Sequence, residues 1–477
     1  MNRRLFSDWA AIALFWTALV LAGFPPPHVD DSFFTGTAVS LASGHGLTNP
    51  WIVNWFTAFA SNRYYAQPPF QPWILAGWIR LVGVSTFSFL AYAGVLGFIV
   101  STTVFTLLRK SGEDRFWAYL AVVTTAVFLL HYGLRPDALG LACLAIAQLW
   151  LFRPSGLSSY FAGTFATGCA VVCHPFTLAF ALPLFLWATW RYAASQTEAK
   201  KAAGPMALTV LLAAAVVSGL VALAVFGHLH DLTHTFFQHA RLVTPSGTYR
   251  WKNFWGELVL GKELVLRQPA LIACLVGGLR LTALEIQGQR HAELGLFACW
   301  VGAGVLGYFL YAQYVVFYLF YSAVILFPLF WRRGWPKAWR QGLLRGGAVL
   351  IVGWSLTPSI VVLIAGNRRP SPAIVRALQA VAAEAPVHGL YADEFALRYA
   401  FNFRPPPQFQ DWSFRSPAGS LAVTRLAAKP KGDIWAISPH KLDLYVPDSG
   451  IHSRPFVLFG VRFNSTPGDA ADSVILR

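Results

Sequence analysis

Long apolar runs separated by short polar stretches fill the first 365 residues of the chain. A helix needs roughly 20 residues to cross about 30 Å of hydrocarbon, and runs of about that length recur throughout this part. The pattern therefore predicts about eleven membrane-spanning helices. They lie near residues 9–24, 86–108, 117–133, 135–152, 157–173, 175–191, 205–226, 267–284, 294–311, 314–331 and 343–365.

One further apolar segment, 69–83, is short for a span, and a count of twelve or thirteen spans is the alternative. It offers only about ten residues between Pro72 and Gly83, which predicts a helix lying in or dipping into the membrane interface. Most loop cations then fall on one side, which the positive-inside rule identifies as cytoplasmic. We expect a cytoplasmic N-terminus, long outer loops at 25–85 and 227–266, and a C-terminus on the outer side.

Residues 366–477 differ in character, because they are polar and rich in proline with only short apolar runs. The pattern predicts a helix over Pro370–Glu384 and strands at Val387–Ala392, Ile434–Ile437 and Phe456–Phe459. The predicted fold class is an all-α polytopic membrane protein whose transmembrane domain, 1–365, is followed by a small outer α/β domain, 366–477.

Composition agrees with a membrane protein. The chain is 56% hydrophobic and only 12% charged, against about 25% charged residues in soluble domains. The net charge of +16 resides mostly in short turns rather than in one basic stripe, which argues against nucleic-acid binding. All five cysteines lie inside apolar runs, so we expect no disulfide framework, and Cys169 and Cys173 are interpreted as small packing residues.

Two adjacent acids, Asp30 and Asp31, follow the first predicted span, in a chain with only 21 acidic residues. Close carboxylates repel each other, which raises one pKa and makes that group a better proton acceptor near neutral pH. The alternative is that an aspartate caps the helix predicted at 32–43. The two interpretations are compatible, since one aspartate can cap while the other reacts.

Candidate substrate contacts follow at two predicted outer turns. Arg135-Pro136-Asp137 opens the fourth span, which is ordinary helix-start chemistry. Alternatively, Arg135 faces a phosphate, because the guanidinium donates two parallel hydrogen bonds, and Asp137 orients that phosphate or a sugar hydroxyl. His174 lies between two spans and is either a capping residue or a substrate contact.

The second outer loop is rich in histidine, cations and aromatic residues. His230 and His234 share a helical face and are weak candidates for a divalent metal site, or else they donate to a lipid headgroup. Arg241, Arg250 and Lys252 are interspersed with aromatic residues. They fit either a phosphate on a lipid tail or an interfacial anchor.

Four short segments, in this order, together resemble one known family. They are Asp30-Asp31 after the first span, Ser43-Gly44-His45-Gly46-Leu47, Tyr65-Ala66-Gln67-Pro68-Pro69 and Arg135-Pro136-Asp137-Ala138-Leu139. The pattern, over roughly residues 5–330, resembles the GT-C fold glycosyltransferases of the protein O-mannosyltransferase and lipid A aminoarabinose transferase branch.

The resemblance implies a sugar donor on a polyprenyl phosphate and an inverting displacement at the outer face of the bacterial inner membrane. It places Asp30 in the position of the base and requires no cofactor. Two departures stand out: Asp31 replaces the common glutamate, and Phe33-Phe34 replaces the usual aromatic-basic residues. We therefore look to Arg63, Arg135 and Arg250 for the donor phosphate, with Tyr65 as a further substrate contact.

The sequence thus predicts a glycosyltransferase whose partners are the polyprenyl-phosphate-linked sugar, a lipid, glycan or protein acceptor, and membrane lipids. The alternatives are a lipid or polysaccharide transporter and an inactive assembly partner. A transporter often carries charges at mid-membrane and internal repeats, whereas the span interiors here lack acids and show no repeat. The sequence names neither the sugar nor the acceptor.

Overall fold

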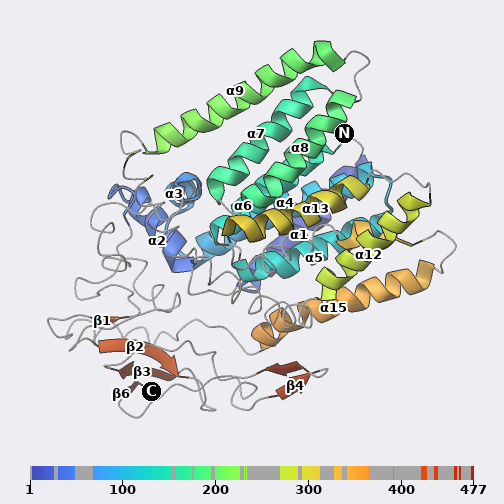
Figure 1. Ribbon diagram of the computed structural model, residues 1–477. Helices are drawn as coiled ribbons and strands as arrows, with labels where there is room; N and C mark the ends of the chain where they lie inside the picture. The colour runs from blue at the N-terminus through green and yellow to red at the C-terminus, as the bar shows by residue number, and fades with distance from the viewer. Residues whose placement is uncertain are drawn as a thin grey trace. The chain divides into compact units, whose positions relative to one another are not determined.

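The computed structural model describes much of the helical part of the chain and six short strands. It covers residues 3–25, 31–48, 68–132, 134–152, 156–174, 177–194, 199–225, 230, 233, 269–287, 293–311, 327–335 and 341–364, together with the strands. Helices dominate this part of the chain (Figure 1).

The described helices follow the apolar pattern closely. They are α1 (Arg3–Leu21), α2 (Asp31–Ala42), α3 (Phe70–Val82), α4 (Thr86–Lys110), α5 (Arg115–Tyr132), α6 (Pro136–Leu151), α7 (Leu157–Cys173), α8 (Leu178–Ala194), α9 (Ala199–Val225), α12 (Pro269–Ile286), α13 (Glu293–Tyr311) and α15 (Gln341–Ile364). All but one of the predicted apolar segments coincide with one of these helices. The exception, 314–331, lies mostly outside the described residues, although 327–333 is helical.

Two described helices are long and apolar enough to cross a membrane by length and composition alone. They are Phe87–Lys110 within α4 and Ala203–Leu223 within α9. Large apolar side chains stay exposed along α9, including Leu208, Leu211 and Leu223. The membrane crossings and their orientation stay predictions.

The chain divides into two compact units. The first comprises Met1–Ala18, Ala66–Phe70 and Gly94–Thr357, and the second comprises Leu19–Tyr65, Gln71–Ala93 and Pro358–Arg477. The predicted division at residue 365 stays a prediction.

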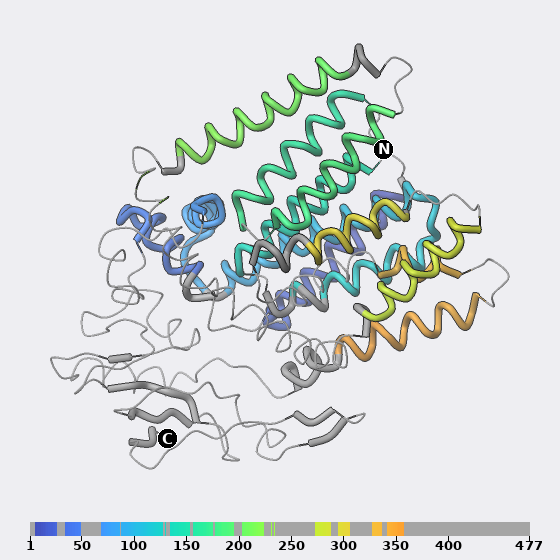
Figure 2. Tube along the Cα trace, viewed as in Figure 1, coloured from blue at the N-terminus to red at the C-terminus, as the bar shows by residue number. Residues whose placement is uncertain are grey.

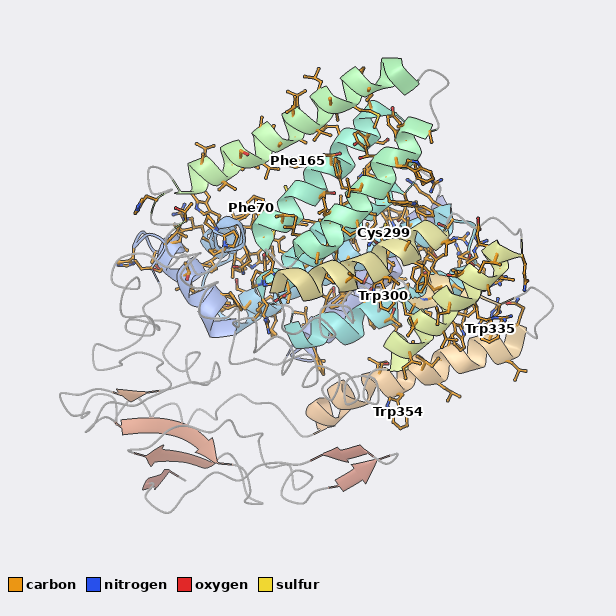
Figure 3. The ribbon with its side chains drawn as sticks, in the orientation of Figure 1. Phe70, Phe165, Cys299, Trp300, Trp335 and Trp354 are labelled. Atoms are coloured by element: carbon orange, nitrogen blue, oxygen red, sulfur yellow. The ribbon has the colours of Figure 1, made fainter. Side chains whose placement is uncertain are left out.

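Close helix packing builds the first unit, and the tube in Figure 2 shows α6, α7 and α8 running alongside one another. Glycines permit the closest approaches. A Cβ on Gly277 of α12 would lie 2.5 Å from the carbonyl oxygen of Phe330. Between α13 and α8, the Sγ of Cys299, labelled in Figure 3, donates to the Pro183 carbonyl. All five cysteines are free and buried or half-buried, as predicted.

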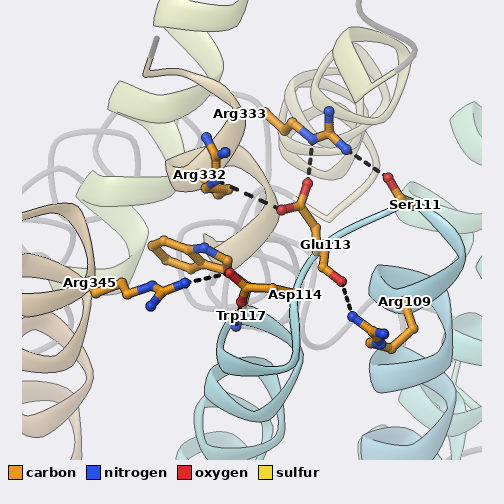
Figure 4. A network of polar contacts seen from close by, with 8 residues as sticks. All are labelled: Arg109, Ser111, Glu113, Asp114, Trp117, Arg332, Arg333 and Arg345. Atoms are coloured by element: carbon orange, nitrogen blue, oxygen red, sulfur yellow. Dashed lines mark hydrogen bonds and ion pairs between the residues drawn. The ribbon is translucent and has the colours of Figure 1, made fainter. Parts of the chain in front are cut away.

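A polar network joins the turn between α4 and α5 to Arg332 and Arg333 of the helical segment 327–333 and to Arg345 of α15 (Figure 4). The buried carboxylate of Glu113 pairs with Arg333, which also donates to the Ser111 carbonyl. Asp114 pairs with Arg345 at 2.6 Å. These residues therefore meet at one end of the first unit.

The start of α1 lies at this same end. Tyr119 donates a 2.7 Å hydrogen bond to the buried Asp8 of α1, and Arg115 pairs with Asp8 at 3.4 Å. Trp16 donates to Ser101 at 2.9 Å further along α1 and α4. Within this unit, α1 therefore runs antiparallel to α4.

The second unit contains α2, α3 and the strands. Arg80 near the end of α3 donates a 3.1 Å hydrogen bond to the carbonyl of Leu41 in the last turn of α2. Beyond α2, Gly44 adopts a φ of 82° and its N–H donates back to Leu41, which is a common way to end a helix. The α2 helix matches the prediction at 32–43 to within one residue.

The strands form two small sheets. They are β1 (Leu390–Tyr391), β2 (Leu421–Leu426), β3 (Ile434–Ser438), β4 (Phe456–Leu458), β5 (Val461–Phe463) and β6 (Val474–Leu476). One sheet has the order β1-β2-β3-β6, in which β1 and β2 are parallel and the other pairs antiparallel, and β4 pairs with β5.

Three of these strands overlap predicted segments. The prediction at Ile434–Ile437 is confirmed by β3, and the one at Phe456–Phe459 is confirmed by β4. Only the two residues of β1 fall within the strand predicted at Val387–Ala392. The helix predicted at Pro370–Glu384 lies outside the described residues.

Candidate functional site

The structure describes part of the predicted site. Seven predicted residues lie outside the described part of the chain, namely Asp30, Arg63, Tyr65, His234, Arg241, Arg250 and Lys252. Asp31, Arg135, Asp137, His174 and His230 lie within it.

Asp31 is the first residue of α2. It follows the end of α1 at Leu21 after a short connection that contains Pro25, Pro26 and Pro27. The acid pair therefore stands where the chain passes from an apolar helix into a second, short helix. In this position an aspartate is also well placed to stabilise the helix N-terminus.

Arg135 and Asp137 form a close pair at the start of α6. Pro136 occupies the first helical turn, and Arg135 precedes it with an extended backbone of φ −79° and ψ 156° and makes no side-chain cap. The Nε of Arg135 donates a 2.9 Å hydrogen bond to Oδ2 of Asp137. The Arg135 side chain is 14% exposed and the Asp137 side chain 3%.

His174 faces the other oxygen of Asp137 from the end of α7. Its Nε2 lies 3.7 Å from Asp137 Oδ1, and its side chain is 2% exposed. Burial lowers the pKa of His174, partly opposed by the carboxylate of Asp137. The neutral imidazole is therefore favoured near pH 7.

The backbone around His174 is well fixed. Its N–H donates to Ala170 at 3.1 Å. Both the N–H and the hydroxyl of Thr177 donate to its carbonyl, at 3.0 and 2.7 Å. A Cβ on Gly140 of α6 would lie 2.9 Å from the Thr177 methyl group, so glycine lets this turn approach α6. Sequence reasoning missed Gly140 and Thr177, although both stand within a few residues of predicted site residues.

The structure thus brings together three of the predicted site residues, Arg135, Asp137 and His174. All three lie within the first unit. The arrangement holds a guanidinium at the start of a helix with one buried carboxylate and one buried imidazole behind it. A guanidinium held in this way suits a planar, bidentate interaction with a phosphate or carboxylate.

The metal interpretation gains no support from the described residues. His230 is exposed. Within the described ranges, no group of three or more histidine, cysteine, aspartate or glutamate side chains could hold a metal ion. Its proposed partner His234 lies outside them, so this prediction stays untested.

Comparisons with solved structures show a distant likeness. No protein-family model matches the chain, and a search of curated proteins finds no match. The chain is similar to the crystal structure of ArnT from Cupriavidus metallidurans bound to undecaprenyl phosphate, with 14% sequence identity and a TM-score of 0.43. The likeness covers 84% of this chain and 76% of that one. At this level, it establishes neither a family nor an activity for this chain.

Proposed function

We propose that this protein is an integral-membrane glycosyltransferase of the GT-C type. It transfers a sugar from a polyprenyl-phosphate donor to a lipid, glycan or protein acceptor. The reaction takes place at the periplasmic face of a bacterial inner membrane, with the N-terminus in the cytoplasm and residues 366–477 in the periplasm.

The observation that carries this proposal is the position of the acid pair in the sequence, between α1 and the start of α2 at Asp31. The 19 residues of α1 extend about 28 Å at 1.5 Å per residue, close to the thickness of the hydrocarbon core. A chain that enters α1 on the cytoplasmic side therefore presents Asp30 and Asp31 just beyond the opposite boundary. That is where a lipid-linked donor exposes its phosphate and sugar.

The network at the opposite end of α1 supports this orientation. Asp8, near the start of α1, meets Arg115, and the neighbouring α4–α5 turn meets Arg333 and Arg345. These cations belong to the loops that the charge pattern predicts to be cytoplasmic. Because α1 runs antiparallel to α4, an even number of crossings separates them, which fits a 13-residue α3 that does not cross.

The reaction we propose is a single inverting displacement. Asp30 accepts the proton of an acceptor hydroxyl, and that oxygen attacks the anomeric carbon from the face opposite the phosphate. The bond between the anomeric carbon and the phosphate oxygen breaks, and polyprenyl phosphate leaves with the electron pair. Asp31 keeps the base oriented at the start of α2.

Arginine side chains stabilise the charge that grows on the departing phosphate. Arg135 is the described candidate, since Asp137 holds its guanidinium. Arg63 and Arg250 are proposed to share this role. Tyr65, Arg241 and Lys252 complete the contacts with the sugar and the lipid. No metal is required for this displacement.

The test replaces each acid by its amide. Cells expressing the wild type, Asp30→Asn, Asp31→Asn or an empty vector are compared by mass analysis of lipids and glycans. We expect a sugar-modified product that requires the wild-type chain and falls at least a hundredfold in Asp30→Asn, because the general base is lost.

Asp114→Asn is the matched control, because Asp114 lies in the network at the opposite end and is half exposed. It should retain the product. Unchanged product in both acid variants, at normal protein levels, would rule out the proposed chemistry.

A further inference from the structure

We propose that His174 is a positioning residue for phosphate recognition: acting through Asp137, it fixes the guanidinium of Arg135 without touching the ligand itself. The proposal deepens the proposed function and rests on it for the identity of the phosphate. It gives His174, which the sequence left as either a capping residue or a substrate contact, a role that acts through Asp137.

The three side chains differ in how much of their surface a ligand can reach. Arg135 keeps 14% of its side chain exposed, whereas Asp137 keeps 3% and His174 2%. Of these three residues, an anion can therefore approach Arg135 best. An anion would also be repelled by the carboxylate of Asp137, which makes that residue a poor direct contact.

Asp137 controls the direction of the guanidinium. The Nε–H of Arg135 is one of five N–H donors in a rigid plane, and its 2.9 Å bond to Oδ2 fixes the orientation of that plane. The bond restrains a side chain that otherwise has many rotamers, so less conformational entropy is lost when a phosphate binds.

His174 in turn restrains Asp137. Its Nε2 lies 3.7 Å from the oxygen that does not accept from Arg135, so the carboxylate has a polar group on each side. A buried carboxylate is destabilised unless polar or cationic groups compensate for lost water. Turning the carboxylate away would give up both compensating groups.

The turn between α7 and α8 holds His174 in its place. The carbonyl of His174 accepts from Thr177 twice, and Gly140 lets this turn lie close to α6. The restraint therefore passes from the turn to His174, then to Asp137, and ends at Arg135, the most exposed of the three.

A purely structural role predicts something different. If the three residues only fasten α6 to α7, then removing the imidazole lowers stability and leaves ligand affinity unchanged. If His174 positions Arg135, then its removal weakens phosphate binding only while Arg135 is present. A double-mutant cycle separates these cases.

The experiment uses the full chain purified in detergent, with undecaprenyl phosphate as the probe and undecaprenol as the phosphate-free control. Tryptophan fluorescence titration gives the dissociation constants for wild type, His174→Gln, Arg135→Gln and the double variant. Tyr160→Phe is the matched control. It removes a part-buried side-chain hydrogen bond between α7 and α8, the 2.6 Å contact with Thr189.

We expect wild type to prefer the phosphate, Arg135→Gln to weaken its binding by about tenfold or more, and His174→Gln by roughly three- to tenfold. In the Arg135→Gln background, His174→Gln should cause no further loss, and Tyr160→Phe should bind like the wild type. An equal loss in both backgrounds, or no loss in the single His174 variant, overturns the positioning role.

A second measurement distinguishes a failure of the proposed polyprenyl-phosphate donor from a failure of the positioning role of His174. If wild type does not prefer undecaprenyl phosphate to undecaprenol, the proposed donor is wrong. The positioning role is then judged by the rate at which phenylglyoxal modifies Arg135, followed by peptide mass analysis. Faster modification in His174→Gln than in both wild type and Tyr160→Phe supports it, and equal rates overturn it.

Discussion

Buried carboxylates in the described residues come with compensating partners. Asp137 has Arg135 and His174, Glu113 has Arg332 and Arg333, and Asp8 has Tyr119 and Arg115. Removing one member of a buried ion pair leaves an uncompensated charge, which destabilises a protein more than the pair itself stabilises it.

Replacing Glu113 by glutamine should therefore lower stability. Arg333 and Arg332 lose their shared counter-ion, but their side chains keep 31% and 18% exposure, so we expect a loss of only about 1–3 kcal/mol. Thermal unfolding in detergent measures it. Asp114→Asn is the control, because both partners in its pair with Arg345 are over 40% exposed and should contribute at most about 1 kcal/mol.

The burial of His174 predicts a pH dependence of stability. Its pKa in the folded protein is lowered from 6.5, so below about pH 6.5 the unfolded chain binds more protons than the folded chain. The free energy of unfolding should therefore fall as the pH drops below this value toward the folded pKa.

The His174→Gln variant lacks the imidazole that takes up a proton on unfolding. Asp137 and Arg135 are present in both the wild type and the variant. The advantage in melting temperature of wild type over the variant should shrink between pH 8 and pH 5.5. A constant difference would show that the imidazole does not titrate differently on unfolding.

At the scale of helices, packing depends on glycines as much as on large side chains. The Gly277 position on α12 lies against backbone atoms, since a Cβ there would approach the Phe330 carbonyl oxygen to 2.5 Å. Backbone cannot rotate out of the way as a side chain can, so a methyl group must push α12 and its neighbour apart.

Gly277→Ala should thus destabilise the protein by about 1–3 kcal/mol through overpacking. Gly346→Ala in α15 is the matched control, because a Cβ there meets nothing within 4 Å. It should be neutral or stabilise the helix by about 0.5–1 kcal/mol. Thermal unfolding of the two variants side by side measures the difference, and equal effects would contradict the contact.

The helices were the most predictable elements, because a long apolar run has few alternatives to a helix. Even the short α3 could be recognised from Pro72 and Gly83. Strands β2, β5 and β6 were not predicted, since a few residues with weak alternation carry little information without their pairing partners. Strand pairing is a tertiary property, and β2 forms its backbone hydrogen bonds with β1 and β3.

The sequence identified the described residues of the candidate site but not which of them are buried. Arg135, Asp137 and His174 could be placed at the same end of a helical hairpin from the order of α6 and α7. The sequence did not indicate that two of them are buried while the third keeps some exposure. That depends on how closely the turn after His174 approaches Gly140.

At the scale of the whole molecule, the prediction concerns sidedness. If the eleven predicted spans cross and α3 does not, the α4–α5 turn shares the cytoplasm with the N-terminus, and residues 366–477 lie outside. Alkaline phosphatase fused after Lys110 should then be inactive, and fused after Arg477 it should be active. The reverse pattern would place the acid pair in the cytosol and end the proposed function.

The hydrogen bond from Arg80 to Leu41 bears on how the acid pair could respond to its surroundings. It joins the C-terminal end of α2 to α3. The 12 residues of α2 form a helix about 18 Å long. A displacement of α3 therefore also bears on α2, the helix that begins at Asp31.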